Sequence, residues 1–304
     1  MKEELSMQQP YQGALTGALA LPLLALLFAA GNPSPLSAQS LNWEGQTGVF
    51  ITPLAYTAAS PKNGFGRPIV AYHYLDAGDV LGGFHQASVT AGLLGRAEFG
   101  YTRDLHREGG TPGLSPLWSS GFNILHAKLN LVPENAGKNK WLPAVSIGAV
   151  GRTQVRNVGG AIRKQDTSNA DFYLVATKTV TQVKGLPLVF NLGYKATNAS
   201  VFGLAGNAPA RQGRLFGAAA FVLKGPWKSQ LIFGSEFAQQ PRQVQDLPGA
   251  IVPTTITYAA RIVPLPERSK FNVDFGVAQA AGTVLPGVNL RARHQFALGI
   301  SYGL

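Results

Sequence analysis

The final residues of the chain constrain its fold more than any other stretch. From residue 295 to residue 304, small or polar side chains alternate with apolar or aromatic ones, which are Phe296, Leu298, Ile300, Tyr302 and Leu304. A strict period of two predicts a β-strand with one apolar face and one polar face. A terminal strand of a soluble sandwich would also alternate, but it need not end the chain on its apolar face with this spacing.

The spacing of Gly299, Tyr302 and Leu304 resembles the C-terminal signal by which bacterial outer-membrane barrels are recognised for assembly. In that signal a glycine is followed by aromatic or large apolar residues three and five positions later, and Leu304 stands here in place of the more usual Phe. The resemblance implies that the apolar face of this strand contacts lipid, while the face of Arg291 and Arg293 looks into a lumen. The implied partners are outer-membrane lipid and the barrel-assembly machinery.

The chain from Pro68 onward repeats this pattern in about twelve segments of strand length. Most are near the roughly 9–11 residues that cross a bilayer when a strand is tilted. They are 68–75, 84–94, 96–107, 118–132, 141–157, 171–182, 186–198, 211–223, 227–239, 254–263, 269–279 and 291–304. We therefore expect an all-β fold, a transmembrane antiparallel β-barrel of about twelve strands, with an even count because both termini lie on one side.

The connections between these segments alternate in length. Those at 94–96, 183–185, 224–226 and 264–268 are short, and 133–140 is only a little longer. The intervening ones, at 76–83, 108–117, 158–170, 199–210, 240–253 and 280–290, are longer. Short periplasmic turns and longer extracellular loops are typical of outer-membrane barrels, whereas a sandwich has no reason to separate them.

The two faces of most segments are easily distinguished. In 269–279, for example, Phe271, Val273 and Phe275 oppose Asn272 and Asp274. The segment 171–182 is harder to interpret, because Phe172 and Leu174 share a face with Lys178. Since a lysine favours a lumen over lipid, we assign Lys178 to the lumen and Tyr173 and Val175 to the lipid face.

The N-terminal part divides into two pieces. Residues 14–30 are nearly all apolar and small residues follow at Ala38 and Ser40, so we predict a signal peptide over residues 1–38 or 1–40. The alternative is a membrane anchor, since the apolar run approaches the roughly 18 residues needed to span a bilayer. Prolines make a regular strand improbable in residues 41–67, which we expect to line the periplasmic mouth or to fold into the lumen. The barrel then occupies residues 68–304.

Composition agrees with a surface that is largely not exposed to water. Charged residues make up only 13% of the chain, against about 25% in ordinary soluble domains. The net charge of +11 favours anionic membranes or solutes as partners. Nucleic acid is the weakest partner, because the basic residues form no long run and no reading motif is present. The chain contains no cysteine, which excludes disulfides and thiolate chemistry.

Catalytic and cofactor motifs are absent from the sequence. It contains no phosphate-binding loop, no serine-hydrolase elbow and no zinc-protease motif, and its five histidines lack the spacing of metal ligands. Residues 76–79 contain two aspartates, but an Asp/Gly turn explains them better than a calcium site. We expect no cofactor, no metal and no enzyme activity. A lipid hydrolase using His294 remains an alternative, although no serine partner can be recognised.

Several segments resemble an uncharacterised bacterial family of predicted outer-membrane proteins, a domain-of-unknown-function family. They are residues 41–48, 82–88, 98–103, 176–179 and 259–266, and the resemblance covers nearly all of the mature chain. It supports the barrel fold and the bacterial outer membrane as the location. It implies no site residues.

The alternation of faces assigns a set of charged side chains to the lumen. These pore-lining candidates are Arg96, Glu98, Lys128, Arg152, Arg156, Lys178, Lys195, Arg214, Glu236, Arg261, Lys270, Asp274, Arg291 and Arg293, with Asp104 as a further acid. Cations outnumber acids, and an unpaired excess would attract anions. The sequence therefore predicts a narrow passive pore for small anionic solutes. The alternative is a structural or assembly barrel, in which these charges form an ion-pair network that fills the lumen.

Overall fold

The computed structural model describes residues 40–77, 82–110, 121–155, 167–183, 185–204, 206–241, 254–264, 270–280 and 295–304. All of them belong to one compact unit within residues 33–304. The predicted signal segment, except Ser40, lies outside the described residues. Among the described residues, the structure contains no helix that is both long enough and apolar enough to span a bilayer.

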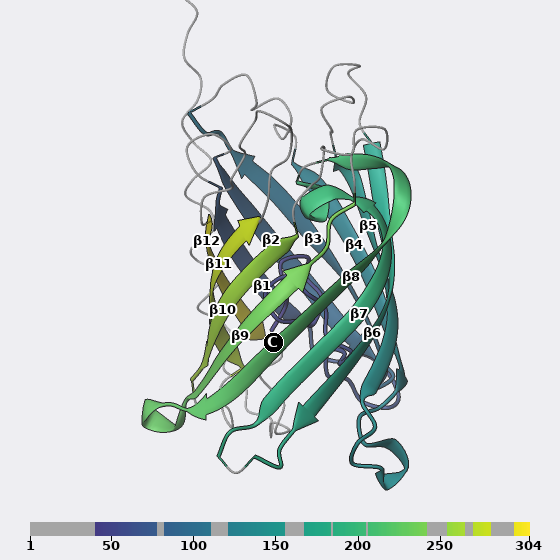
Figure 1. Ribbon diagram of the computed structural model, residues 1–304, viewed down its shortest axis with the longest axis vertical. Coiled ribbons are helices and arrows are strands. Elements are labelled where there is room, and N and C mark those ends of the chain that lie inside the picture. The colour runs from purple at the N-terminus through teal and green to yellow at the C-terminus, as the bar shows by residue number, and fades with distance from the viewer. Residues whose placement is uncertain are drawn as a thin grey trace, which may run out of the picture. The chain divides into compact units, whose positions relative to one another are not determined.

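Twelve β-strands make up most of this unit (Figure 1). They are β1 (Ile69–Asp76), β2 (Gly83–Leu93), β3 (Ala97–Arg107), β4 (Phe122–Val132), β5 (Ala144–Val155), β6 (Thr167–Val180), β7 (Leu188–Ala199), β8 (Asn207–Lys224), β9 (Gln230–Ala238), β10 (Thr255–Val263), β11 (Phe271–Ala280) and β12 (Gln295–Gly303). Within the described ranges, three short 3-10 helices lie in connections, namely η3 (Ala136–Lys138), η4 (Ser200–Gly203) and η5 (Pro226–Lys228).

The strands form one closed antiparallel barrel in chain order. The last strand closes it by pairing with the first, with Ile69 opposite Gly303 and Asp76 opposite Phe296. Closure satisfies the backbone groups that an open sheet would leave at its two edges. The prediction of a barrel of about twelve strands is confirmed.

In the last strand, β12, the alternation of residue types corresponds to one face that points into the barrel and one that points outward. Ala297 and Ser301 are buried, whereas Phe296 and Ile300 are exposed on the outer face. Gly299 faces inward opposite His73, whose ring occupies the space that a Cβ at Gly299 would need. A glycine at this position is therefore required by packing as well as by any assembly signal.

The assignment of faces in β6 is wrong and is reversed in the structure. Tyr173 and Val175 are 6% and 0% exposed and point inward, whereas Phe172 and Leu174 are 54% and 51% exposed and point outward. Lys178 shares this outer face, at the end of the strand. There its ammonium group lies 3.1 Å from Glu134 Oε1 and donates to Asn135 Oδ1 at 2.7 Å. A lysine at a rim reaches polar partners without entering the lumen.

Connections of different kinds gather at the two ends of the barrel, shown below and above in Figure 1. We call the end with the connections 94–96, 133–143, 181–187, 225–229 and 264–270 the short-turn end, and the opposite one the long-loop end. The predicted contrast in length is weaker than the sequence suggested. The β4–β5 connection reaches Pro143, and β8 begins earlier than predicted because Asn207 still pairs with Ala199.

Residues 40–58, which precede β1, lie inside the barrel, where Figure 1 shows them in the purple trace behind the front strands. The described chain before β1 contains no regular strand, only the isolated bridges Leu41–Thr47, Gly48–Pro53 and Phe65–Leu93. Trp43, Phe50, Ile51 and Ala55 are buried in the same apolar cluster as inward residues of the wall. We call residues 40–58, which fill the lumen, the plug.

Candidate functional site in the lumen

A compact turn forms the tip of the plug. Asn42 Oδ1 accepts hydrogen bonds from the backbone N–H groups of Glu44 and Gln46, at 3.1 and 2.9 Å. Gly45 has φ of +87°, and a Cβ there would overlap Thr102 Oγ1 on the wall. Asparagine side chains stabilise such turns and glycine tolerates positive φ, so the local sequence favours this conformation.

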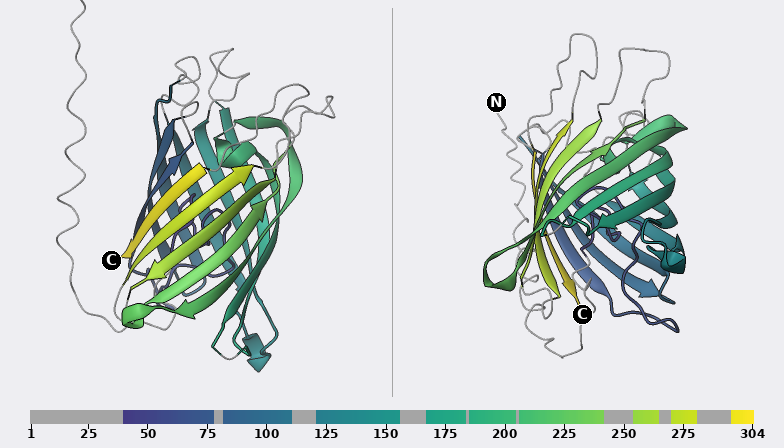
Figure 2. Two further views of the ribbon diagram at one scale, coloured as in Figure 1. Left: turned by 60° about the vertical axis from the view of Figure 1, so that its left-hand side comes forward. Right: turned by 60° about the horizontal axis from the view of Figure 1, so that its bottom comes forward.

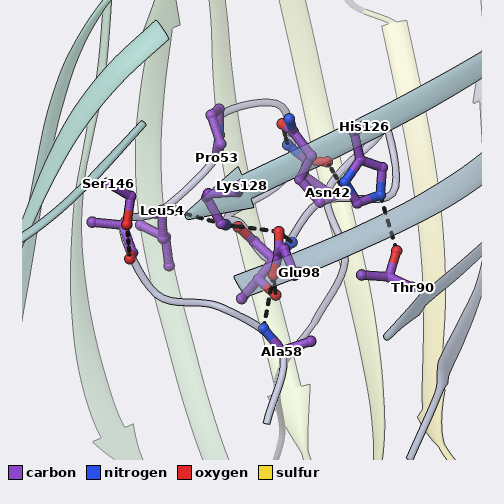
Figure 3. Close-up of polar contacts among 12 residues, drawn as sticks. Asn42, Pro53, Leu54, Ala58, Thr90, Glu98, His126, Lys128 and Ser146 are labelled. Atoms are coloured by element: carbon purple, nitrogen blue, oxygen red, sulfur yellow. Dashed lines mark hydrogen bonds and ion pairs between the residues drawn. The ribbon is translucent and has the colours of Figure 1, made fainter. Parts of the chain in front are cut away.

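Glu98 on β3 and Lys128 on β4 form the first anchor of the plug (Figure 3). The two residues are direct cross-strand neighbours, and Lys128 Nζ lies 2.9 Å from Glu98 Oε1. The Glu98 carboxylate also accepts from Thr47 N at 3.1 Å, Thr47 Oγ1 at 2.6 Å and Ala58 N at 2.7 Å. Lys128 donates to the carbonyls of Thr47 and Leu54, at 3.0 and 2.9 Å. One ion pair of the wall thus binds the plug at its middle, through Thr47 and Leu54, and at its end, through Ala58.

Glu236 on β9 forms the second anchor in a different way. Its carboxylate accepts hydrogen bonds from three successive backbone N–H groups, those of Phe50, Ile51 and Thr52, at 2.7 to 3.1 Å. Thr52 Oγ1 donates a further bond at 2.6 Å. No lysine or arginine among the described residues lies within ion-pair distance of this carboxylate. Its charge is therefore compensated by donors of the plug alone.

Arg152 on β5 joins the tip of the plug to the neighbouring strand β6. Its Nε donates to Glu44 Oε1 at 2.6 Å, and its Nη2 donates to Asp171 Oδ2 at 3.0 Å. Lys195 Nζ lies 3.5 Å from the same Asp171 oxygen. The guanidinium is fully buried, and two carboxylates balance the charges of Arg152 and Lys195.

Asp274 on β11 holds the beginning of the plug. Its Oδ1 accepts from Arg261 Nε at 2.5 Å, while its Oδ2 accepts from Ser40 Oγ at 2.6 Å. Arg261 Nη2 donates in turn to the carbonyl of Val49 at 2.8 Å. The same ion pair therefore contacts the plug at two points.

Uncharged side chains of the wall complete the contacts. Ala55 N donates to Thr177 Oγ1 at 2.7 Å, and Ala55 O accepts from Asn130 Nδ2 at 3.0 Å. Near the end of the plug, Tyr56 OH donates to Glu134 Oε2, in the β4–β5 connection, at 2.9 Å. Burial raises the pKa of the Tyr56 phenol above its ordinary value, and the negative charge of Glu134 raises it further. Tyr56 is thus a neutral hydrogen-bond donor at ordinary pH.

Little space remains between the plug and the wall beside Asp171 and Lys195. A cavity of about 20 Å³ lies there, lined by side chains that include Glu44, Asp171, Lys195 and Phe216. A cavity of this size holds about one water molecule. The plug therefore obstructs this part of the lumen.

Twelve of the fourteen predicted pore-lining residues fall into three groups. Glu98, Lys128, Arg152, Lys195, Glu236, Arg261 and Asp274 face inward and contact the plug or its partners. Arg214 and Lys270 lie toward the two ends, bonded to the carbonyls of Gln240 and Leu304. Arg156, Arg291 and Arg293 lie outside the described residues, as does His294.

Two of the pore-lining predictions are wrong. Arg96 is exposed in the turn between β2 and β3, because β3 begins at Ala97 and not at Arg96. Lys178 lies on the outer face, for the reason given above. Asp104 does face inward, buried, and accepts from Gln86 Nε2 at 3.0 Å.

Two acids of the lumen, Glu44 and Asp171, were missed as site residues. Glu44 precedes the barrel, so strand periodicity could not place it, although it falls within residues 41–48 that carry the family resemblance. Asp171 was missed because the faces of β6 were reversed.

Among the described residues, no three histidine, aspartate or glutamate side chains are grouped so that they could hold a metal ion.

The fold and its contents define a class, a closed twelve-stranded barrel whose lumen contains its own N-terminal segment. The chain belongs to the family described as protein of unknown function, DUF3034, whose family model matches residues 39–252. The matched region includes the whole plug. The resemblance found in the sequence is confirmed.

A search of solved structures matched several porins. The KdgM porin has a TM-score of 0.45 at 8% identity, with 78% of this chain and 99% of that chain covered. The NanC porin has a TM-score of 0.47 at 8% identity, with 78% and 100% covered. OprB of Pseudomonas putida has a TM-score of 0.31 at 11% identity, with 73% and 59% covered. No curated protein matches the sequence.

Proposed function

We propose that the protein is an outer-membrane β-barrel whose lumen is closed at rest by the plug, and that small solutes pass only when the plug is displaced. The observation that carries this proposal is the set of buried anchors, Glu98–Lys128, Glu236, Arg152 and Asp274, which bind the plug from several sides of the wall. So many directional contacts to an irregular segment indicate a specific seat for it in the lumen.

Location in a membrane is supported by the outer face. Large apolar side chains are exposed on strands all round the barrel, among them Tyr72 at 43%, Leu125 at 59%, Leu192 at 58% and Tyr258 at 55%. A soluble protein rarely exposes so much contiguous apolar surface. Lipid is the solvent that such a face requires, and the short-turn end then faces the periplasm.

The sequence also predicted a preference for anionic solutes. The contacts of the plug change which residues could supply that preference. The four cations around the plug, Lys128, Arg152, Lys195 and Arg261, each lie within ion-pair distance of a carboxylate. This part of the lumen therefore carries no excess positive charge that could attract anions. An anion preference of the displaced state would depend on Arg156, Arg291 and Arg293.

A reversible lock on the plug tests the proposal. Because the chain contains no cysteine and Ala55 N contacts Thr177 Oγ1, the double variant Ala55→Cys with Thr177→Cys can join the plug to β6. We expect brief openings in a planar bilayer for the reduced protein and none after oxidation. The single variant Ala55→Cys, treated with the same oxidant, should behave like the reduced protein.

The possible results separate the alternatives. Steady conductance in the oxidised double variant would show that solutes pass beside the seated plug, which contradicts the proposal. A complete lack of openings in the reduced and unaltered proteins would favour the structural barrel. Loss of anion preference when Arg156, Arg291 and Arg293 are changed to Gln would assign selectivity to those residues.

A further inference from the structure

The short-turn end of the barrel carries an unbalanced set of basic side chains. Six exposed cations lie there, on four separate segments of the chain. They are Lys62 and Arg67 before β1, Arg96 between β2 and β3, Lys140 between β4 and β5, and Lys224 and Lys228 at the β8–β9 connection. None of them has a carboxylate partner within ion-pair distance among the described residues. The described acidic side chain at this rim, Glu134, is already bound to Lys178 and Tyr56. This set, which we call the basic rim, is therefore available to an outside anion.

Contacts and topology place the basic rim around the mouth rather than in one patch. Residues 59–67 lie against the β2–β3 turn, since Gly66 N donates to Gly92 O and Gly95 N donates to Ser60 Oγ. The β4–β5 and β8–β9 connections, which hold Lys140 and Lys228, lie at the same end on other parts of the wall (Figure 2). A partner that contacts all of them must surround the barrel.

Two tryptophans mark the same rim. Trp141 is 73% exposed and follows Lys140, while Trp227 is 88% exposed and precedes Lys228. Directly beside them begins the apolar outer face, with Leu131 on β4 and Leu223 on β8. Tryptophan favours the boundary between hydrocarbon and headgroups, and adjacent lysines favour anionic headgroups.

We infer that the basic rim binds anionic phospholipid headgroups, with Trp141 and Trp227 in the interface and the lysines on the phosphates. An acidic protein would fit a compact patch better than a ring that borders an apolar belt. The inference rests on the proposed membrane location but not on the movement of the plug.

The experiment titrates the full-length barrel in detergent with phosphatidylglycerol or phosphatidylcholine whose acyl chains carry bromine, which quenches nearby tryptophan fluorescence. We expect quenching at lower concentrations of phosphatidylglycerol than of phosphatidylcholine, and a loss of this preference at high salt. A basic side chain near a membrane surface is worth about fivefold in affinity. Lys224→Gln with Lys228→Gln should therefore weaken binding of phosphatidylglycerol roughly twentyfold.

The matched control is Arg107→Gln with Arg211→Gln, which removes two exposed cations from the long-loop end. It should leave the lipid preference unchanged. The inference would be overturned if this control lost as much affinity for phosphatidylglycerol as the lysine variant. It would also be overturned if both lipids quenched the unaltered protein equally, and that result would favour an acidic protein as the partner of the basic rim. Failure of both lipids to quench would instead contradict the proposed membrane location.

Discussion

Glu98 and Glu236 are both buried carboxylates that hold the plug, yet their charges are compensated in different ways. Glu98 is paired with Lys128, its cross-strand neighbour, so that most of its compensation belongs to the wall itself. Glu236 depends on three backbone N–H groups and one hydroxyl of the plug. If the plug left, Glu98 would keep its cation, whereas Glu236 would lose all of these donors. The first anchor therefore stabilises the barrel, and the second specifically favours the closed state.

The largest effect should come from breaking the wall pair. Lys128→Met leaves Glu98 buried without its cation, which costs about 3–5 kcal/mol when a buried pair loses one partner. We expect a correspondingly lower free energy of unfolding in urea, followed by tryptophan fluorescence. The double variant Glu98→Gln with Lys128→Met should recover much of the loss. An unchanged stability of the single variant would contradict the role of this pair.

Glu236→Gln should loosen the plug while leaving the wall intact. The amide presents one acceptor and one donor to four donors, and hydrogen bonds to charged groups are worth about 1.5–3 kcal/mol each. Proteases should therefore cleave within residues 40–58 faster than in the unaltered protein, while the unheated protein keeps its gel mobility.

The matched control for this prediction is Thr257→Val, opposite Glu236 on β10. Thr257 is buried, and its hydroxyl has no hydrogen-bond partner among the described residues. The Thr257→Val variant should therefore leave the rate of cleavage of the plug unchanged. If the plug resisted proteases equally well in the Glu236→Gln protein and in the unaltered protein, Glu236 would not hold the segment.

A pair of hydroxyl deletions compares the two anchors directly and should have the smallest effects. Thr47 Oγ1 donates to Glu98 and Thr52 Oγ1 donates to Glu236, both at 2.6 Å. Thr52→Val should destabilise the seated plug by about 1–2 kcal/mol and Thr47→Val by less, because Lys128 still compensates Glu98. The measure is the urea concentration at which the plug becomes accessible to protease. A larger effect at Thr47 would reverse the comparison.

The barrel itself could be predicted because its signal is local. Alternation with a period of two places neighbouring side chains on opposite faces of any strand, so Ser301 and Phe296 could be assigned from the sequence near them. The same rule was misleading in β6, where Lys178 was treated as a lumen residue. At the end of a strand, a long side chain can find polar partners outside the lumen, and Glu134 comes from a connection that periodicity does not describe.

The seating of the plug was decided by the tertiary structure alone. The sequence by itself determined that residues 41–67 form no regular strand and lie at the mouth or in the lumen, because prolines remove ladder hydrogen bonds. It could not choose between these positions, since the anchors join residues that are far apart in the chain. Ser40 and Asp274 are separated by 234 positions, and Thr52 and Glu236 by 184. Only closure of the barrel brings such residues within hydrogen-bond distance.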